Sequence, residues 1–133
     1  LQALAEKLGV DQLVVFPGYV EEEDLWALLR QAACLCLPTE IEGFGFPVIE
    51  AMACGCPVVT SNCSSLPEIS GQAALYVNPL SVTDISHALK LVSELNSEKR
   101  QSLIQAGFTQ VRQFSWEKTA KETLKLYQEV VKC

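Results

Sequence analysis

The chain has no lysine or arginine from Gln31 through Ala88, and its formal net charge is −6 over 133 residues. Proteins that bind DNA or RNA neutralise phosphates with basic side chains, so this charge balance argues against a nucleic-acid partner. Any anion site in this stretch must depend on backbone N–H groups and helix dipoles. Either a cation from outside the stretch completes such a site, or the site binds its anion weakly.

The sequence also lacks a hydrophobic run long enough to cross a bilayer, although 49% of its residues are hydrophobic. Its first ten residues read as part of an amphipathic helix and do not resemble a signal peptide. A chain of this length fits one domain and can bury roughly two-thirds of the surface that its unfolded form exposes. We therefore expect a single soluble domain over residues 1–133, located in the cytoplasm.

Six cysteines are present, and four of them form the Cys-x-Cys pairs Cys34/Cys36 and Cys54/Cys56. Residues two apart on a strand point to one face, so a zinc site is conceivable. Structural zinc sites more often use Cys-x2-Cys or wider spacings with further ligands downstream. Both pairs lie where small buried side chains are wanted, so we expect free cysteines and no metal ion. Disulfides are also unexpected in a reducing compartment.

Short apolar runs alternate with helix-type patterns in the first part of the chain. We expect strands at residues 13–16, 34–37, 57–60 and 73–77, and helices at residues 1–8, 21–33 and 47–54, with one helical turn in the polar loop 61–71. Helices are also expected at 82–95, 98–114 and 116–131, with Ser81, Ser97 and Ser115 as caps. This order indicates an α/β fold: a Rossmann-like parallel sheet of about four strands with helices on both faces and a helical C-terminal end.

The segment from Glu42 to Glu50 combines a glycine pair, a proline and two carboxylates eight positions apart. We expect it to join strand 34–37 to the next helix, with Phe46 at the cap and Pro47 as the first helical residue. Phenylalanine has no side-chain acceptor, so the helix start stays open and favours an anion such as phosphate. Ligands of parallel sheets bind beyond the carboxyl ends of the strands, where this segment lies. A ligand that is part phosphate and part sugar suits this turn.

Glu50 has a second interpretation, in which it only caps its own helix. A capping-box glutamate belongs at the third helical position, which is Ile49 when Pro47 is first. The register can shift by one residue, because helix ends are the least certain part of an assignment. We favour a ligand role for Glu50 over simple helix stabilisation.

The block Glu42-Gly-Phe-Gly-Phe-Pro-Val-Ile-Glu50, continued by Ala-Met-Ala-Cys-Gly-Cys-Pro-Val-Val, resembles the signature of glycosyltransferase family 4 and its relatives. These are retaining enzymes of the GT-B architecture, and they include sucrose synthase, bacterial glycogen synthase and many mannosyltransferases. The resemblance extends to three further regions: residues 16–20 (Phe-Pro-Gly-Tyr-Val), residues 65–79 and residues 114–116 (Phe-Ser-Trp). It covers nearly all of the chain. It implies the donor-binding half of a glycosyltransferase that moves a hexosyl group from a nucleotide-diphosphate sugar to an acceptor.

The resemblance also implies roles for the matching residues. Glu42 would be the catalytic residue facing the donor sugar, and Glu50 would bind the ribose hydroxyls. Four residues would hold donor phosphate and sugar hydroxyls through their backbone: Gly43, Phe44, Gly45 and Phe46. Tyr19 and Val20 would lie near the base. Such enzymes need no metal ion or other cofactor, and their departing diphosphate is thought to help deprotonate the acceptor.

GT-B enzymes have two Rossmann-like domains, and the resemblance covers only the second. The first strand of that domain, and the arginine and lysine that grip the diphosphate, would precede Leu1. The expected partners are the nucleotide sugar and an acceptor domain of the same enzyme, with peripheral membrane association through the missing part left open. The 133 residues alone should hold the donor poorly and transfer nothing. The last helix carries an apolar stripe that we expect to pack in the core, as such stripes mostly do: Trp116, Ala120, Leu124, Tyr127 and Val131. The resemblance implies a second interpretation, in which this helix crosses to the other domain and leaves part of the stripe exposed here.

Two other classes stay open at this point. A response-regulator-like module needs a phosphoacceptor aspartate at a strand end, but Asp11, Asp24 and Asp84 follow no expected strand. A catalytically inactive relative, which only binds nucleotide sugars or has a regulatory role, is disfavoured by the two glutamates but not excluded. The single histidine, His87, is expected on the surface or in packing. Glu68 is expected to fix its own loop and not to touch substrate.

Overall fold

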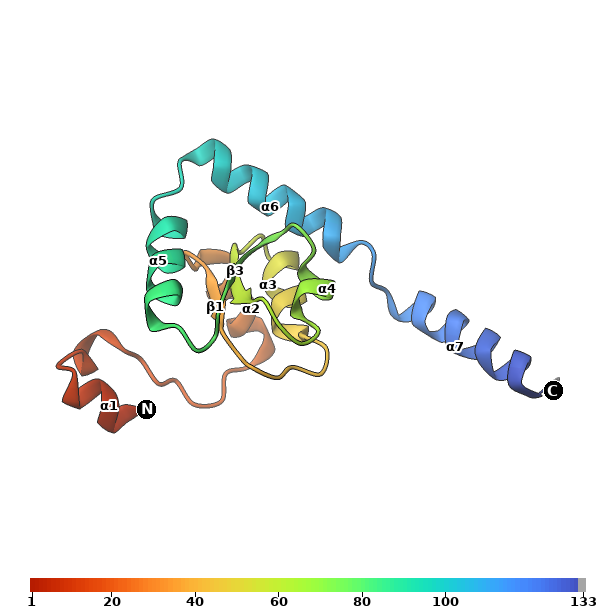
Figure 1. Ribbon diagram of the computed structural model, residues 1–133, viewed down its shortest axis with the longest axis horizontal. Coiled ribbons are helices and arrows are strands. Elements are labelled where there is room, and N and C mark those ends of the chain that lie inside the picture. Colours follow the sequence, from red (N-terminus) through yellow and green to blue (C-terminus); the bar gives the residue numbers. More distant parts are fainter. Residues whose placement is uncertain (132–133) are drawn as a thin grey trace.

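The computed structural model describes residues 1–131, and a three-stranded parallel sheet lies at the centre of this range (Figure 1). The strands are β1 (Leu35–Leu37), β2 (Val58–Ser61) and β3 (Ala74–Val77), in the order β1-β2-β3. Val59 of β2 pairs with Cys36 on one side and with Leu75 on the other, so β2 is the central strand. Each parallel connection carries a helix, because the chain must cross over to start the next strand in the same direction.

The helices occur close to where the sequence predicts them: α1 (Gln2–Lys7), α2 (Glu22–Gln31), α3 (Phe46–Ala53), α4 (Leu66–Ser70), α5 (Val82–Ser93), α6 (Ser97–Val111) and α7 (Trp116–Val131), with a short 3-10 helix η1 at Asp11–Leu13. Ser81 and Ser115 cap the starts of α5 and α7 with their hydroxyls, as predicted. The prediction of Ser97 as a cap is wrong by one residue, because the side chain of Asn96 caps α6.

Helices cover both faces of the sheet, because successive side chains of a strand point to opposite sides. Val58 packs into a cluster with residues of α2, α3, α4 and α6, whereas Val59 packs with Val77 and with residues of α5. Figure 1 shows α5 and the α3–α4 pair on opposite sides of the strands. Both valines are fully shielded from solvent, which confirms the prediction of a parallel sheet buried on both faces.

The predicted strand at residues 13–16 does not form, so the sheet has three strands in the described range instead of about four. Residues 14–20 run as a loop after η1, and the side chains of Leu13 and Val15 are 82% and 83% exposed. A strand needs a neighbour for its backbone hydrogen bonds, and none of the strands within residues 1–131 lies beside this segment. An apolar run alone is therefore insufficient to form a strand at these residues.

Both ends of the described chain stand away from the core (Figure 1). α1 and η1 form a small unit on one side, and α7 extends from the other side as a lone helix without a buried residue. The apolar stripe of α7 consequently faces solvent, with Trp116 76% and Tyr127 64% exposed, so the prediction that it packs in the core is wrong for the described chain. Among residues 1–131, every helix is too short or too polar to cross a membrane.

Candidate functional site

The open helix start predicted from the sequence forms at the carboxyl end of β1. Gly45 is the N-cap with φ 113°, Phe46 is the first helical residue and Pro47 is the second. The prediction of Phe46 at the cap is wrong by one residue, because this left-handed backbone favours glycine. A side chain at this position would also be crowded, since a Cβ added to Gly45 would lie 3.1 Å from Leu66 Cδ2. The turn thus depends on glycine for both its backbone angle and its packing.

A row of backbone N–H groups at this turn has no hydrogen-bond partner within residues 1–131: those of Gly43, Phe44, Gly45 and Phe46. The N-cap makes no side-chain hydrogen bond, and Pro47 has no N–H to contribute. Unsatisfied amides and the positive end of the α3 dipole together attract an anion. These amides are the part of the site best suited to a phosphate group.

Glu42 immediately precedes the free amides and is half-buried. Its Cγ lies 3.9 Å from the position that a Cβ on Gly45 would take, so the side chain turns toward the start of α3. Within residues 1–131 its carboxylate forms no hydrogen bond or ion pair. A carboxylate held at this turn without a protein partner is available to a ligand.

Glu50 is the fifth residue of α3 and is also half-buried. A capping-box glutamate stands at the third helical position, which is occupied by Val48. In the described part of the chain the Glu50 carboxylate likewise has no hydrogen bond or ion pair. Its geometry therefore rules out the helix-capping interpretation and leaves the carboxylate free to accept hydrogen bonds from hydroxyl groups.

Tyr19 and Val20 line a groove whose lining does not include the turn at residues 42–46. The groove has a volume of about 500 Å³ and is also lined by residues of the loop before α2 and of α2 itself: Pro17, Glu21, Asp24, Ala27, Leu28 and Gln31. Neither glutamate of the site lines this groove, and Tyr19 is 86% exposed. The structure thus places Glu42 beside the free amides, whereas the two predicted base contacts line a groove that includes neither Glu42 nor those amides.

Two serines that were not identified from the sequence hold the turn in place. Ser64 Oγ accepts from the Glu42 N–H at 3.1 Å and donates to the Glu42 carbonyl at 2.8 Å. Ser65 Oγ lies 2.8 Å from the Glu42 carbonyl oxygen and 3.0 Å from that of Phe44. The sequence marks both serines by their place after β2, at the same edge of the sheet as the turn, and Ser65 also opens a region of the family resemblance.

The side chain of Glu68 does not fix the α4 loop, contrary to the prediction. Its carboxylate makes no hydrogen bond or ion pair within the described range, and Gln110 Nε2 instead donates to the carbonyls of Glu68 (3.4 Å) and Ile69 (2.8 Å).

The Tyr76 hydroxyl donates to the Gly71 carbonyl at 2.6 Å, and burial raises the pKa of Tyr76. The phenol therefore remains a hydrogen-bond donor at neutral pH.

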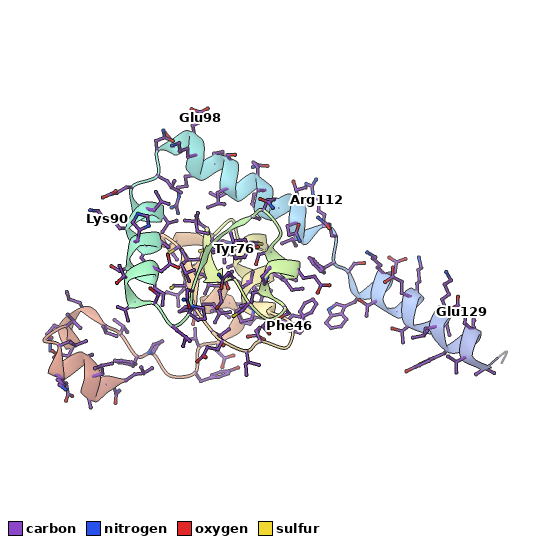
Figure 2. All side chains as sticks on the ribbon, in the orientation of Figure 1. Phe46, Tyr76, Lys90, Glu98, Arg112 and Glu129 are labelled. Carbon is purple, nitrogen blue, oxygen red and sulfur yellow. The ribbon has the colours of Figure 1, made fainter. Side chains whose placement is uncertain are left out.

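Aromatic rings link the turn to α7. The Phe44 ring lies 4.8 Å from that of Phe46 and 5.9 Å from that of Phe114, and Phe46 stacks on Trp116 with centroids 6.0 Å apart. Figure 2 shows Phe46 on the side of the core from which α7 departs. The first residue of α3 is therefore in direct contact with the first residue of α7.

The cysteine pairs do not form a metal site in the described structure. Residues 1–131 contain no group of three or more histidine, cysteine, aspartate or glutamate side chains placed to hold a metal ion. Burial raises the pKa of the Cys34, Cys36 and Cys56 thiols, and for Cys34 the neighbouring cysteines add to the effect. Metal ligation requires the thiolate, so these environments favour the inert, protonated form.

Comparison with protein families and known proteins gives consistent matches. The family model described as "Glycosyl transferases group 1" matches residues 1–110. The chain is 39% identical over 128 residues to the O-antigen chain mannosyltransferase B of Escherichia coli. The match covers 96% of this chain and 33% of that protein. It is 32% identical over 133 residues to the MMP alpha-(1->4)-mannosyltransferase of Mycolicibacterium hassiacum. That match covers 98% of this chain and 32% of the relative.

A solved structure shares the fold. Sucrose-phosphate synthase from Thermosynechococcus elongatus matches with a TM-score of 0.86 and 27% sequence identity, over 98% of this chain and 33% of that one. The chain therefore spans about a third of the length of the curated relatives and of the structure that it matches.

Proposed function

The chain belongs to the glycosyl transferases group 1 family, and from that premise we propose that it is the donor-binding half of a retaining GT-B enzyme of family 4. In the proposed reaction a hexosyl group passes from a nucleotide-diphosphate sugar to an acceptor. The observation that carries the proposal is the row of unpartnered amides at residues 43–46 beside the free carboxylate of Glu42. The names of the two mannosyltransferase relatives support sugar transfer as the reaction type.

Each group of the turn has a chemical task in that reaction. The amides and the positive end of α3 hold the diphosphate, whose negative charge grows as the sugar leaves. Glu42 faces the donor sugar, where its charge stabilises an oxocarbenium-like centre. Glu50 accepts hydrogen bonds from the ribose hydroxyls. The leaving diphosphate takes the acceptor proton on the same face of the sugar, and the configuration is retained.

We also propose that a second, acceptor-binding domain of the same enzyme completes the site, and that no metal ion takes part. The share of the relatives that this chain covers and the exposed stripe of α7 both support a further domain. The diphosphate needs a cation, and residues 31–88 contain no lysine or arginine, so we expect that cation to come from outside this stretch. Tyr19 and Val20 stay predicted base contacts, which requires residues 14–20 to pack beside α3 in the complex.

Ligand-observed NMR with UDP-, GDP- and ADP-activated hexoses, mannose included, tests the donor site. We expect Glu50→Ala to weaken binding about 10- to 150-fold, because hydrogen bonds to a charged group contribute about 1.5–3 kcal/mol. Glu68→Ala is the matched control, since that carboxylate is exposed and unpaired within residues 1–131, and it should change affinity less than about twofold. Equal losses would contradict the ribose role. Because the 133 residues alone are expected to hold the donor poorly, the titrations use the full-length enzyme, and its failure to bind any of these donors would contradict the proposed function.

A further inference from the structure

The direction of the free amides is decided by the carbonyls that precede them. No cis peptide bond occurs within residues 1–131, and a trans peptide plane carries its C=O and its N–H in opposite directions. Any group that holds the Glu42 carbonyl therefore aims the Gly43 N–H, and any group that holds the Phe44 carbonyl aims the Gly45 N–H. Both carbonyls are held by the serine pair that follows β2.

The serine pair departs from its local preferences to make these contacts. Ser64 has φ 59° and is the one non-glycine residue with positive φ in the described range. Such a conformation is uncommon for residues with a side chain. Ser65 stands at the N-cap of α4, where serine usually bonds a helix N–H, yet it makes no capping hydrogen bond. Both hydroxyls are instead directed across to the turn at residues 42–44.

Neighbouring side chains also hold carbonyls in the rest of this loop. Thr60 Oγ1 donates to the Leu37 carbonyl at 3.0 Å, Ser61 Oγ donates to the Thr39 carbonyl, and Cys63 Sγ lies 3.5 Å from the carbonyl oxygen of residue 40. No backbone-to-backbone hydrogen bond joins residues 38–45 to residues 61–66 in the described chain. Side-chain donors from the end of β2 thus hold the carbonyls of the loop. Apart from the Glu42 N–H, which donates to Ser64 Oγ, the N–H groups of residues 39–45 have no partner in the described chain.

We propose that Ser64 and Ser65 are positioning residues of the donor site, which set the peptide planes 42–43 and 44–45 so that the Gly43 and Gly45 amides already point at the donor diphosphate before it binds. This inference rests on the proposed function and names the residues that prepare its site. Amide groups that are fixed before the ligand binds lose less conformational freedom on binding, and they need no rearrangement as charge develops on the diphosphate.

Ser64→Gly separates positioning from stability. Glycine adopts positive φ readily, and this relief offsets the lost hydrogen bonds, so the melting temperature should change little, whereas donor affinity should fall about 3- to 10-fold. A merely structural role would move stability and affinity in the same direction. Ser65→Ala should lower affinity by a similar factor, and Ser65→Thr, which keeps the hydroxyl, should restore it. Ser93→Ala is the matched control, because that hydroxyl donates to the Lys90 carbonyl at 2.7 Å on α5, away from the turn.

A second measurement needs no ligand. Backbone 15N relaxation of Gly43 and Gly45 in the ligand-free chain should show rigid amides in the unaltered chain and mobile ones in the S64G/S65A double variant. Unchanged relaxation together with unchanged donor affinity would overturn the positioning role while leaving the donor site intact. If the full-length enzyme binds no UDP-, GDP- or ADP-hexose, the proposed function fails, and the relaxation of these two amides still decides whether the serines hold the turn.

Discussion

The turn that begins at Glu42 and the segment of residues 16–20 both match the family resemblance, yet the fold holds them in different ways. Side chains at residues 60–65 hold carbonyls along the loop 37–44. Residues 15–20, by contrast, form no hydrogen bond within residues 1–131. In this chain a matching motif is therefore held in place only where neighbouring side chains bind its carbonyls.

The difference follows from the neighbours in the sheet. The loop after β1 lies beside the segment after β2, because parallel strands end at the same edge. The segment at residues 13–16 has no strand beside it in the described structure, so its apolar side chains stay in solvent. Three substitution pairs sharpen this contrast between a supported loop and an unsupported one.

The largest effect is expected from removing the support beneath the loop. Leu66 is fully buried against Gly45, whereas Leu13 is 82% exposed. We expect Leu66→Ala to lower the free energy of unfolding by about 2–5 kcal/mol through lost burial and a residual cavity. Leu13→Ala, the same chemical change in the unsupported segment, should cost less than about 0.5 kcal/mol. Urea unfolding followed by circular dichroism measures both, and similar midpoints would contradict the contrast.

A smaller difference is expected between two glycines of positive φ. An added Cβ at Gly45 meets Leu66, while one at Gly18 meets nothing within 4 Å. Gly18→Ala should therefore cost only the backbone strain, about 1 kcal/mol, and Gly45→Ala about 1–3 kcal/mol because strain and crowding add. Donor affinity should fall only for Gly45→Ala. The pair is compared by thermal unfolding and NMR titration, and a greater cost at Gly18 would refute the account of the loop.

The smallest effect concerns the attachment of α7 to the same turn. Trp116→Ala removes the ring stacked on Phe46, a contact of about 0.5–1.5 kcal/mol, and should shift the Phe46 ring resonances and speed hydrogen exchange in the first turn of α7. Leu124→Ala, on the same exposed helix, should leave the Phe46 resonances unchanged. Resonances that respond alike to both substitutions would show that Phe46 and Trp116 do not stack in solution.

Much of the fold follows from local patterns that act within a few residues. Short apolar runs mark β1, β2 and β3, and polar caps mark the starts of α5 and α7. The start of α3 was predicted to within one residue, because Pro47 is favoured early in a helix and Gly45 permits the turn before it. The cap itself was misassigned to Phe46, since the choice between neighbouring residues depends on a backbone angle that packing imposes.

What the amino-acid order decided on its own was the alternation of elements, the open start of α3 and the two carboxylates eight residues apart. Tertiary structure alone decided that residues 13–16 stay out of the sheet and that Ser64 and Ser65 hold the turn. The β1–β2 pairing and the serine contacts both join residues more than twenty positions apart. Local propensity carries no information about such partners, because their meeting depends on how the sheet assembles.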